Sequence, residues 1–359
     1  MRIGIIGFGV VGKGVYELLK DQHEIVKVFA RSAKAEGIFC QDIKAVLKAK
    51  PEVLIECLPA CEEAYHYIKL ALNQQINVIS SNKAILAKHY HDLLALAKEK
   101  GVSLSFEASV GGGIPILHRL QDMKTYDHIH YIQGILNGTT NYILDKIFDE
   151  KLAFMSALKM AQALGYAEQD YSSDLTGLDV KYKLALIYNT AYDSDINLAD
   201  IYCRGIENLD DRAIGYANDN KMVIRLLGYV DRENAFVLPF FITHDAIWAK
   251  IHLNNNAINI HSQNMQDVYD IGQGAGRYPT ASAICLDVER CMHNQISYQA
   301  NIKNDKSYRF YIQSNNIEDK YIEKRLQDGC ITKQITVKTL KNIIKDLKVF
   351  VGGIYDQGS

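Results

Sequence analysis

The amino-acid sequence predicts an α/β protein in which a doubly wound parallel sheet precedes a second α+β domain and a short C-terminal α+β module. The chain opens with an apolar strand pattern, a glycine-rich turn and a helix pattern. Strand and helix patterns keep alternating to about residue 106, which indicates a parallel sheet covered on both faces. The 359 residues, 48% hydrophobic and 23% charged, are also more than one hydrophobic core usually organises.

The first domain is expected to span residues 1–129. Its first unit is a strand at Arg2 to Ile6, a helix over roughly Val11 to Lys20 and a strand at Val26 to Phe29. The same alternation continues along the chain. The later strands are Val53 to Cys57, Asn77 to Ser80 and Val102 to Phe106, and the helices include Glu62 to Asn73 and Tyr90 to Lys100.

The second domain is expected over residues 130–271, where longer helices mix with strands. The expected helices are Asn141 to Glu150, Ala153 to Leu164 and Leu178 to Tyr192, and the expected strands include Phe236 to Ile242 and Lys250 to Leu253. Residues 272–292 form a glycine-rich turn running into a helix, which could return the chain to the first domain.

The remaining residues, 293–359, predict a small separate module. Strand patterns occur in SYRFYIQ, CITKQITVK and VFVGGIY, and helix patterns occur in IEDKYIEKRLQ and TLKNIIKDL.

Composition favours a small-molecule ligand over nucleic acid or a membrane. The 40 basic and 42 acidic residues are interspersed and leave a net charge of -2, so no long-range field attracts a polyanion. No run approaches the ~18 apolar residues of a membrane helix. The seven cysteines form no CxxC pair and are odd in number, which favours a cytoplasmic location over a disulfide framework or a zinc site.

The turn after the first strand matches the dinucleotide-binding pattern GxGxxG. Glycines serve ordinary turns in many proteins, but here the pattern follows an apolar strand and opens a helix, as pyrophosphate binding requires. We therefore expect a Rossmann-type domain. The residues assigned to the cofactor are Gly7, Phe8, Gly9, Val10, Val11 and Gly12, with Gly274 in the later glycine-rich turn.

The end of the second strand favours NADP over NAD. A carboxylate about 20 residues after the glycines would bind the adenosine ribose of NAD, but this segment reads Phe29-Ala30-Arg31. Arg31 is suited to a 2′-phosphate, although basic residues in such loops are also often simply solvated.

Two polar segments follow later strands. Ser81 and Lys83 come directly after the strand at Asn77 to Ser80, where Lys83 could reach into a crevice at the carboxyl edge of the sheet or serve as a solvated residue near a helix cap. Glu107 begins the segment EASVGGGIP, whose glycines indicate backbone packed closely against a ligand or another helix.

The residues from Gly165 to Ala185 hold the densest set of charged groups beside apolar ones. Asp179 and Lys183 lie four apart and so on one face of a helix, where such pairs are usually exposed and contribute little. Glu168 and Asp174 lead into the same helix, which continues with apolar residues. Carboxylates and an amine beside a core suit a zwitterionic amino acid and proton transfer by a lysine.

Taken together, these segments resemble the homoserine dehydrogenase family over nearly all of residues 1–292. The matching motifs, in the family order, are GFGVVGKG, SSNKAILA, FEASVGGGIPIL, GILNGTTNYIL, GYAE, DLTGLDVKYKLA and GAGRYPTA. The resemblance implies NAD(P)-dependent interconversion of L-homoserine and L-aspartate 4-semialdehyde, in threonine and methionine biosynthesis, by a homodimer formed through the second domain.

The resemblance also implies residue roles. Lys183 is the catalytic acid/base, Lys83 is a second catalytic lysine near the reacting oxygen, and Asp179 is a substrate-binding and orienting carboxylate. The substrate pocket is formed by Glu168, Asp174, Tyr166, Gly138 and Thr139. Backbone carbonyls around Glu107, Val110, Gly112 and Ile114 resemble a site for Na⁺ or K⁺, and no transition metal is implied.

Three departures from the family pattern stand out. CLPA at 57–60 lacks the glycines of many relatives, Tyr171 replaces a usual proline, and the shortened tail resembles an amino-acid-binding regulatory domain only faintly, which leaves threonine feedback open. Two alternative classes are another two-domain Rossmann oxidoreductase, acting on a sugar or polyol, and a non-catalytic dinucleotide sensor. The acidic set with Lys183 counts against the first, and the presence of both lysines counts against the second.

Overall fold

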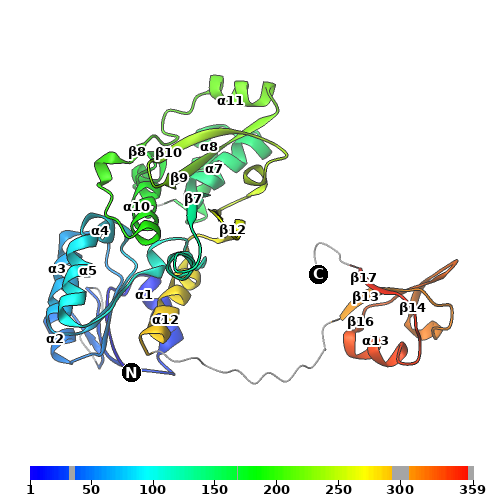
Figure 1. The fold of residues 1–359 in the computed structure, drawn as a ribbon, viewed down its shortest axis with the longest axis horizontal. Coiled ribbons are helices and arrows are strands. Elements are labelled where there is room, and N and C mark those ends of the chain that lie inside the picture. The colour runs from blue at the N-terminus through cyan, green and yellow to red at the C-terminus, as the bar shows by residue number, and fades with distance from the viewer. Residues whose placement is uncertain (32–36, 168, 293–306, 355–359) are drawn as a thin grey trace. The chain divides into compact units, whose positions relative to one another are not determined.

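The computed structural model describes residues 1–31, 37–167, 169–292 and 307–354 and divides the chain into two compact units, Met1–Asn294 and Gln295–Ser359 (Figure 1). The first unit contains two six-stranded sheets, and the second contains one five-stranded sheet. Within the described ranges, no helix combines the length and apolarity needed to cross a membrane.

The first sheet is parallel throughout, with strand order β3-β2-β1-β4-β5-β6. The prediction of a doubly wound parallel sheet is confirmed. Its strands are β1 (Arg2–Ile6), β2 (Glu24–Phe29), β3 (Phe39–Cys40), β4 (Val53–Glu56), β5 (Asn77–Ser80) and β6 (Leu104–Ser105). Its helices are α1 (Val10–Leu19), α2 (Ile43–Lys48), α3 (Glu62–Asn73), α4 (Lys83–Lys88) and α5 (Tyr90–Lys100).

Both faces of this sheet are buried, which explains why its strands are apolar on both sides. Ile3 and Ile5 point to one side and share a core with α1 and α12 (Arg277–Met292), whereas Ile6 points to the other side. Figure 1 shows α12 lying beside α1 although it comes more than 250 residues later in the chain. A Cβ on Gly14 of α1 would lie 3.1 Å from Cβ of Ala281, so this glycine allows the two helices to pack closely.

The second sheet is mixed, with order β12-β11-β7-β9-β10-β8, and only the β10–β8 pair is parallel. Its strands are β7 (Ile129–Ile135), β8 (Tyr202–Cys203), β9 (Met222–Asp231), β10 (Ala235–Thr243), β11 (Asn255–Ser262) and β12 (Gln266–Gln273). The helices around it are α6 (Leu117–Met123), α7 (Gly138–Asp149), α8 (Phe154–Ala163), α9 (Ser172–Leu175), α10 (Leu178–Tyr192) and α11 (Asp211–Asp219).

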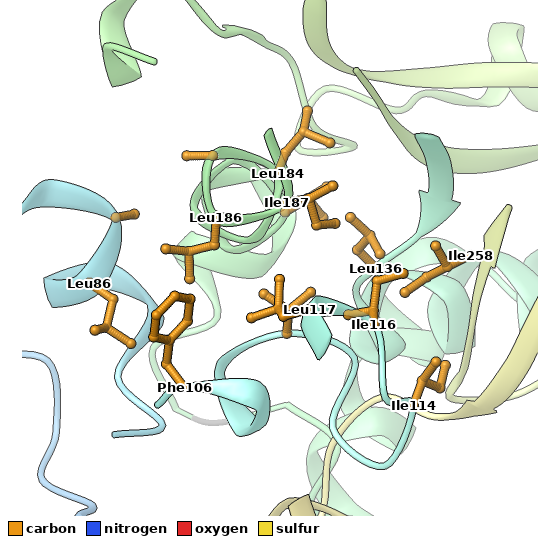
Figure 2. Close-up of a cluster of buried hydrophobic side chains, with 14 of the residues drawn as sticks. Leu86, Phe106, Ile114, Ile116, Leu117, Leu136, Leu184, Leu186, Ile187 and Ile258 are labelled. Atoms are coloured by element: carbon orange, nitrogen blue, oxygen red, sulfur yellow. The ribbon is translucent and has the colours of Figure 1, made fainter. Parts of the chain in front are cut away.

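One apolar cluster joins the two sheets through α10 (Figure 2). Leu86 of α4 and Phe106 approach α10 from the first sheet, and Ile258 of β11 lies on the side of the second sheet. Leu184 and Leu186 of α10 belong to the same cluster and are fully buried. Close packing of this kind fixes the position of α10 relative to α4.

The second unit has its own small core. β13 (Ser307–Ile312), β14 (Ile322–Leu326), β15 (Gly329–Thr332), β16 (Ile335–Thr336) and β17 (Val351–Ile354) form antiparallel pairs, and α13 (Val337–Ile343) contributes Leu340 to the core.

Two expectations from the sequence are wrong. Lys250 to Leu253 is not a strand but a 3₁₀ turn (Ile247–Lys250) and a loop, in which the Asn141 amide donates to the Ile251 and Leu253 carbonyls. IEDKYIEKRLQ is not a helix: its second half is β14, which pairs with β15 across a hairpin. In the first segment contacts distant in sequence override the local pattern, and in the second the pairing of adjacent strands does so.

Candidate active site

The glycine turn between β1 and α1 lines a cavity of about 850 Å³. Gly7 has φ +98°, and a Cβ there would lie 2.4 Å from the Cys57 carbonyl oxygen, so only glycine fits. A Cβ on Gly9 would meet nothing within 4 Å, and no side chain caps α1 at this residue. The start of α1 therefore faces the cavity and can receive a pyrophosphate, as a bound dinucleotide requires.

Most residues assigned to the cofactor from the sequence line this cavity. They are Gly7, Phe8, Gly9, Val10, Val11, Arg31, Ser81 and Lys83. Gly12 does not line it: a Cβ on Gly12 would lie 2.0 Å from the Gly7 carbonyl oxygen, so its role is to let α1 start directly against the turn.

Arg31 lies at the cavity but already has an anionic partner. Its Nη2 lies 2.9 Å from Oε2 of Glu63, and both side chains are largely exposed. Lys88 of α4 also lines the cavity. The cavity lining therefore includes two cationic side chains, Arg31 and Lys88, and Arg31 is paired with an exposed carboxylate.

A second cavity, of about 900 Å³, opens beside the first. The two share the residues Val10, Val11, Ala60, Ser81, Lys83 and Ser173. A ligand that fills the first cavity would meet a ligand in the second at this junction.

A buried carboxylate lies between two lysines in the second cavity. Nζ of Lys183 is 2.7 Å from Oδ2 of Asp179, and Nζ of Lys83 is 2.9 Å from its Oδ1. Lys183 also donates to the Leu136 carbonyl at 2.6 Å. Burial alone would raise the pKa of Asp179, but the charges of Lys183 and Lys83 outweigh it and hold that pKa well below its usual range. The expected pairing of Asp179 with Lys183 is therefore present, in a buried form.

Asn137 connects this group to a second carboxylate. Its Nδ2 donates to Oδ1 of Asp174 at 2.6 Å and to Oδ2 of Asp179 at 2.9 Å. Its Oδ1 accepts from the Thr140 N–H and caps α7. Burial, together with the charge of Asp179, raises the pKa of Asp174. The amide thus holds two carboxylates close together.

The other substrate residues expected from the sequence line the same cavity. Gly138, Thr139 and Tyr166 are among them, and Thr139 Oγ1 donates to the Tyr166 carbonyl at 2.5 Å. A Cβ on Gly138 would lie 2.6 Å from the Asn254 carbonyl oxygen, which explains the glycine. Gly274 also lines this cavity. Glu168 lies outside the described residues.

The loop carrying the candidate cation residues packs beneath the second cavity. Glu107 is buried, and its carboxylate accepts from the Leu117 and His118 N–H groups at 2.9 and 2.7 Å. Gly112 lines the cavity, whereas Val110 and Ile114 are buried. The side chain of Glu107 thus binds the start of α6.

Several site residues were not predicted from the sequence. Asn137 could have been found from LNGTT, because Asn directly before a helix is among the preferred N-cap residues. Ser173 and Asn254 gave no signal: Ser173 lies in the short helix α9 and Asn254 in the turn before β11, and only tertiary packing brings them to the cavity.

Comparisons with known proteins agree with this geometry. Residues 7–107 match the family described as "Homoserine dehydrogenase, NAD binding domain", and residues 115–288 match "Homoserine dehydrogenase". The homoserine dehydrogenase of Helicobacter pylori is 33% identical over 308 residues, covering 80% of this chain and 73% of that protein.

Solved structures give the same family. A putative homoserine dehydrogenase from Archaeoglobus fulgidus has a TM-score of 0.74 at 32% identity, covering 80% of this chain and 98% of that one. A mutant of a hyperthermophilic archaeal homoserine dehydrogenase, solved in complex with NADPH, has a TM-score of 0.72 at 25% identity over 81% of this chain and 97% of that one. The chain belongs to the homoserine dehydrogenase family and is an oxidoreductase with an NAD(P)-binding domain.

Proposed function

We propose that this enzyme interconverts L-homoserine and L-aspartate 4-semialdehyde where its two cavities meet, with Lys183 as the acid/base and Lys83 as a second catalytic lysine. The observation that supports these roles is the Asp179 carboxylate with one lysine on each oxygen. The nicotinamide cofactor supplies the hydride chemistry when bound. We assign this reaction to threonine and methionine biosynthesis.

The protein's own groups provide the proton path. Lys183 uses two of its three N–H groups on Leu136 and Asp179, so one remains for a ligand oxygen in the cavity that it lines. In the reducing direction its ammonium donates a proton to the developing alkoxide, and in the oxidising direction its amine accepts the hydroxyl proton. Asp179 stays ionised and orients both lysines.

Asp174 is proposed to bind the substrate's α-ammonium group, together with Glu168. The pKa of Asp174 is raised by burial and by Asp179, so its carboxylate lacks a full cationic partner. A bound ammonium group would provide one. Tyr166, Gly138 and Thr139 would complete the pocket.

The activity is tested by following oxidation of NADPH and NADH with L-aspartate 4-semialdehyde as the other substrate. Homoserine-dependent reduction of NADP in the reverse direction would complete the assignment. Turnover of a sugar or polyol but not of either amino-acid substrate would refute the proposal.

We further propose a preference for NADP, with Arg31 on the 2′-phosphate. The support is that Arg31 lines the first cavity and that the second strand ends without a carboxylate. The archaeal relative solved with NADPH shows that the fold accepts this cofactor.

A monovalent cation, Na⁺ or K⁺, is proposed at the carbonyls of Glu107, Val110, Gly112 and Ile114. The support for this site is the buried side-chain amide of Asn256, which lies close by. Neither its nitrogen nor its oxygen has a hydrogen-bond partner among the described residues, and a Cβ on Gly274 would touch this amide. A Cβ on Gly112 would in turn touch the Gly274 backbone. Melting temperatures in NaCl, KCl and tetramethylammonium chloride test the site, and identical values would exclude it.

A homodimer is proposed through the second sheet. Rings stack across β11, β7, β9 and β10: Tyr131 with His261 at 4.8 Å and with Tyr229 at 5.6 Å, and Tyr229 with Phe236 at 5.0 Å. A Cβ on Gly228 would touch α10, so the adjacent Tyr229 points to the opposite face of the sheet. Sedimentation should give a dimer that Tyr229→Lys converts to a monomer. Tyr126→Lys, at an exposed tyrosine, should change nothing.

The remaining proposals concern organisation. We divide the chain at residues 129, 271 and 292 and assign residues 293–359 to a reduced regulatory or assembly module. We also place the enzyme in the cytoplasm, where seven unpaired cysteines are stable. Removing residues 295–359 should leave turnover intact if the module is regulatory, and loss of soluble protein would show that it is structural.

A further inference from the structure

Glu56, the last residue of β4, is a fully buried carboxylate that none of the roles above uses. Parallel pairing places it beside Ser80, the last residue of β5. Ser80 Oγ donates to its Oε2 at 2.5 Å, and the Leu58 N–H donates to its Oε1 at 2.7 Å. Glu56 therefore links the carboxyl ends of two neighbouring strands below the junction of the cavities.

Each of these two hydrogen bonds connects Glu56 to a segment that lines one side of that junction. Leu58 begins the Leu58–Ala60 loop, which lines the first cavity, and Ala60 lines both cavities. On the other side, Ser80 Oγ accepts from the Asn82 N–H at 3.1 Å. Asn82 caps α4, whose first residue is Lys83.

The two walls are also tied to each other. The Asn82 amide donates to the carbonyls of Leu58 and Pro59, both at 3.4 Å. Glu56, Ser80, Asn82 and Leu58 thus form a closed hydrogen-bonded ring. Lys83 directly follows Asn82 of this ring, and its Nζ is 2.9 Å from Oδ1 of Asp179.

We propose that Glu56 is a positioning residue for the dehydrogenase reaction, which holds Lys83 at the junction of the two cavities through Ser80 and Asn82. This rests on the catalytic role proposed above for Lys83. A carboxyl side chain suits this ring, because it places one acceptor oxygen toward the Ser80 hydroxyl and the other toward the Leu58 N–H. A glutamine has only one acceptor oxygen, so its NH₂ group would face one of these donors and deprive that donor of its acceptor.

The first variant is Glu56→Gln. Turnover in the reducing direction should fall about 10-fold, because small displacements of a reacting group carry large penalties. The KM for aspartate semialdehyde and the dissociation constant of NADPH, measured by its fluorescence, should stay within about 2-fold of wild type, since the binding groups themselves are retained. A change in KM with unchanged turnover would overturn the proposal.

Ser80→Ala provides a second variant in case Glu56→Gln does not fold. It removes the hydroxyl that connects the carboxylate to Asn82 and should reduce turnover in the same manner. Ser103→Ala is the matched control: Ser103 donates its hydroxyl to Asn77 at 3.0 Å, at the amino end of the same strand β5. Turnover of Ser103→Ala should equal that of wild type. An equal loss in both serine variants would overturn the proposal.

A double-mutant cycle with Lys83→Met shows whether Glu56 acts through Lys83. If it does, Glu56→Gln should reduce the remaining turnover of Lys83→Met by less than about 2-fold, because the group it positions is already absent. Fully additive losses would overturn the proposal. Normal turnover in Lys83→Met would refute the role of Lys83 itself, whereas normal turnover in Glu56→Gln beside an impaired Lys83→Met would refute only the positioning role.

Discussion

Two buried carboxylates, Asp179 in the second cavity and Glu56 at the end of β4, differ in the charge of their partners. Asp179 lies between two ammonium groups, which keep its pKa well below the usual range despite burial. Glu56 accepts only from neutral donors, and burial raises its pKa to about 7 although those hydrogen bonds oppose the shift. Burial alone therefore does not decide the charge of a carboxyl group; its partners do. The pKa of Asp179 is thereby held far below neutrality, whereas that of Glu56 lies at about 7.

The largest effect should come from removing a lysine that contacts Asp179. Lys183→Met should lower turnover by roughly 10²-fold or more while cofactor affinity changes little, because the variant loses proton transfer and retains the cofactor cavity. Wild-type homoserine oxidation should also accelerate toward alkaline pH, since the accepting amine must be unprotonated. Steady-state rates with both substrates measure these effects.

Lys83→Met is the matched comparison, because its ammonium contacts the other oxygen of the same carboxylate. If Lys183→Met keeps near-normal turnover and the wild-type pH profile while Lys83→Met is inactive, the two roles are reversed. If both variants stay active, the proposed proton path is wrong.

The two carboxylates should affect stability with opposite dependence on pH. Asp179, whose folded pKa is depressed, contributes stability above its unfolded pKa and loses it as pH falls through the folded value. Glu56, whose folded pKa is raised from 4.5 to about 7, contributes most below about pH 4.5 and loses that contribution as pH rises through about 7. For Glu56 the change is on the order of 3 kcal/mol.

Thermal melts of wild type, Glu56→Gln and Asp179→Asn between pH 5 and 8 measure this contrast. The difference between wild type and Glu56→Gln should shift by several degrees across this range, in the direction of lower wild-type stability at pH 8. The difference between wild type and Asp179→Asn should be constant over the same range. A flat difference for Glu56→Gln would mean that its carboxyl does not titrate near neutrality.

The sequence predicted the parts of the site that depend on local pattern. The glycine turn follows from the spacing of Gly7 and Gly9, and the Asp179 to Lys183 contact follows from helical periodicity. It did not predict that Lys83 would reach Asp179, because that contact depends on α4 packing against α10 (Figure 2). Glu56 was missed because a carboxylate ending an apolar strand looks like any solvated residue until the neighbouring strand is in place.

Prediction of the fold had the same limit: elements with a clear local pattern were found, and elements that depend on pairing with another segment were missed. Five of the six strands of the first sheet were predicted, because parallel strands buried on both faces are continuous apolar runs, and the two-residue strand β3 was missed. β9 and β12 of the second sheet were not predicted, and β12 alternates only weakly because its residues are exposed or half-buried. Such a strand is specified mainly by pairing with β11.

A substitution at Asn137 tests whether its side-chain amide keeps the carboxylates of Asp174 and Asp179 close together. Asn137→Ser should retain the cap of α7, because serine also accepts at this position, but it removes the two N–H donors on Asp174 and Asp179. The value of kcat/KM for homoserine should fall about 10-fold, as expected for loss of two hydrogen bonds to charged groups. Asp210→Ser, at the cap of α11, is the control and should leave kcat/KM unchanged. An unchanged value in Asn137→Ser would show that capping is the residue's sole role.

The smallest effect concerns Glu63, a carboxylate that like Asp179 has a cationic partner but differs from it in being exposed. An exposed ion pair contributes little, so the Arg31–Glu63 pair should exchange readily for a 2′-phosphate. Arg31→Ala should raise the KM for NADP by about 5- to 10-fold and leave that for NAD nearly unchanged, because only NADP carries the second anion. Glu63→Gln, which removes the competitor and keeps Arg31, should instead leave the KM for NADP equal to or below the wild-type value. Initial rates with both cofactors separate the two variants.

Two outcomes would contradict this prediction. Equal changes in KM for NADP and NAD in Arg31→Ala would mean that Arg31 is only a solvated loop residue. A raised KM for NADP in Glu63→Gln would mean that the ion pair orients Arg31 toward the phosphate and does not compete with it.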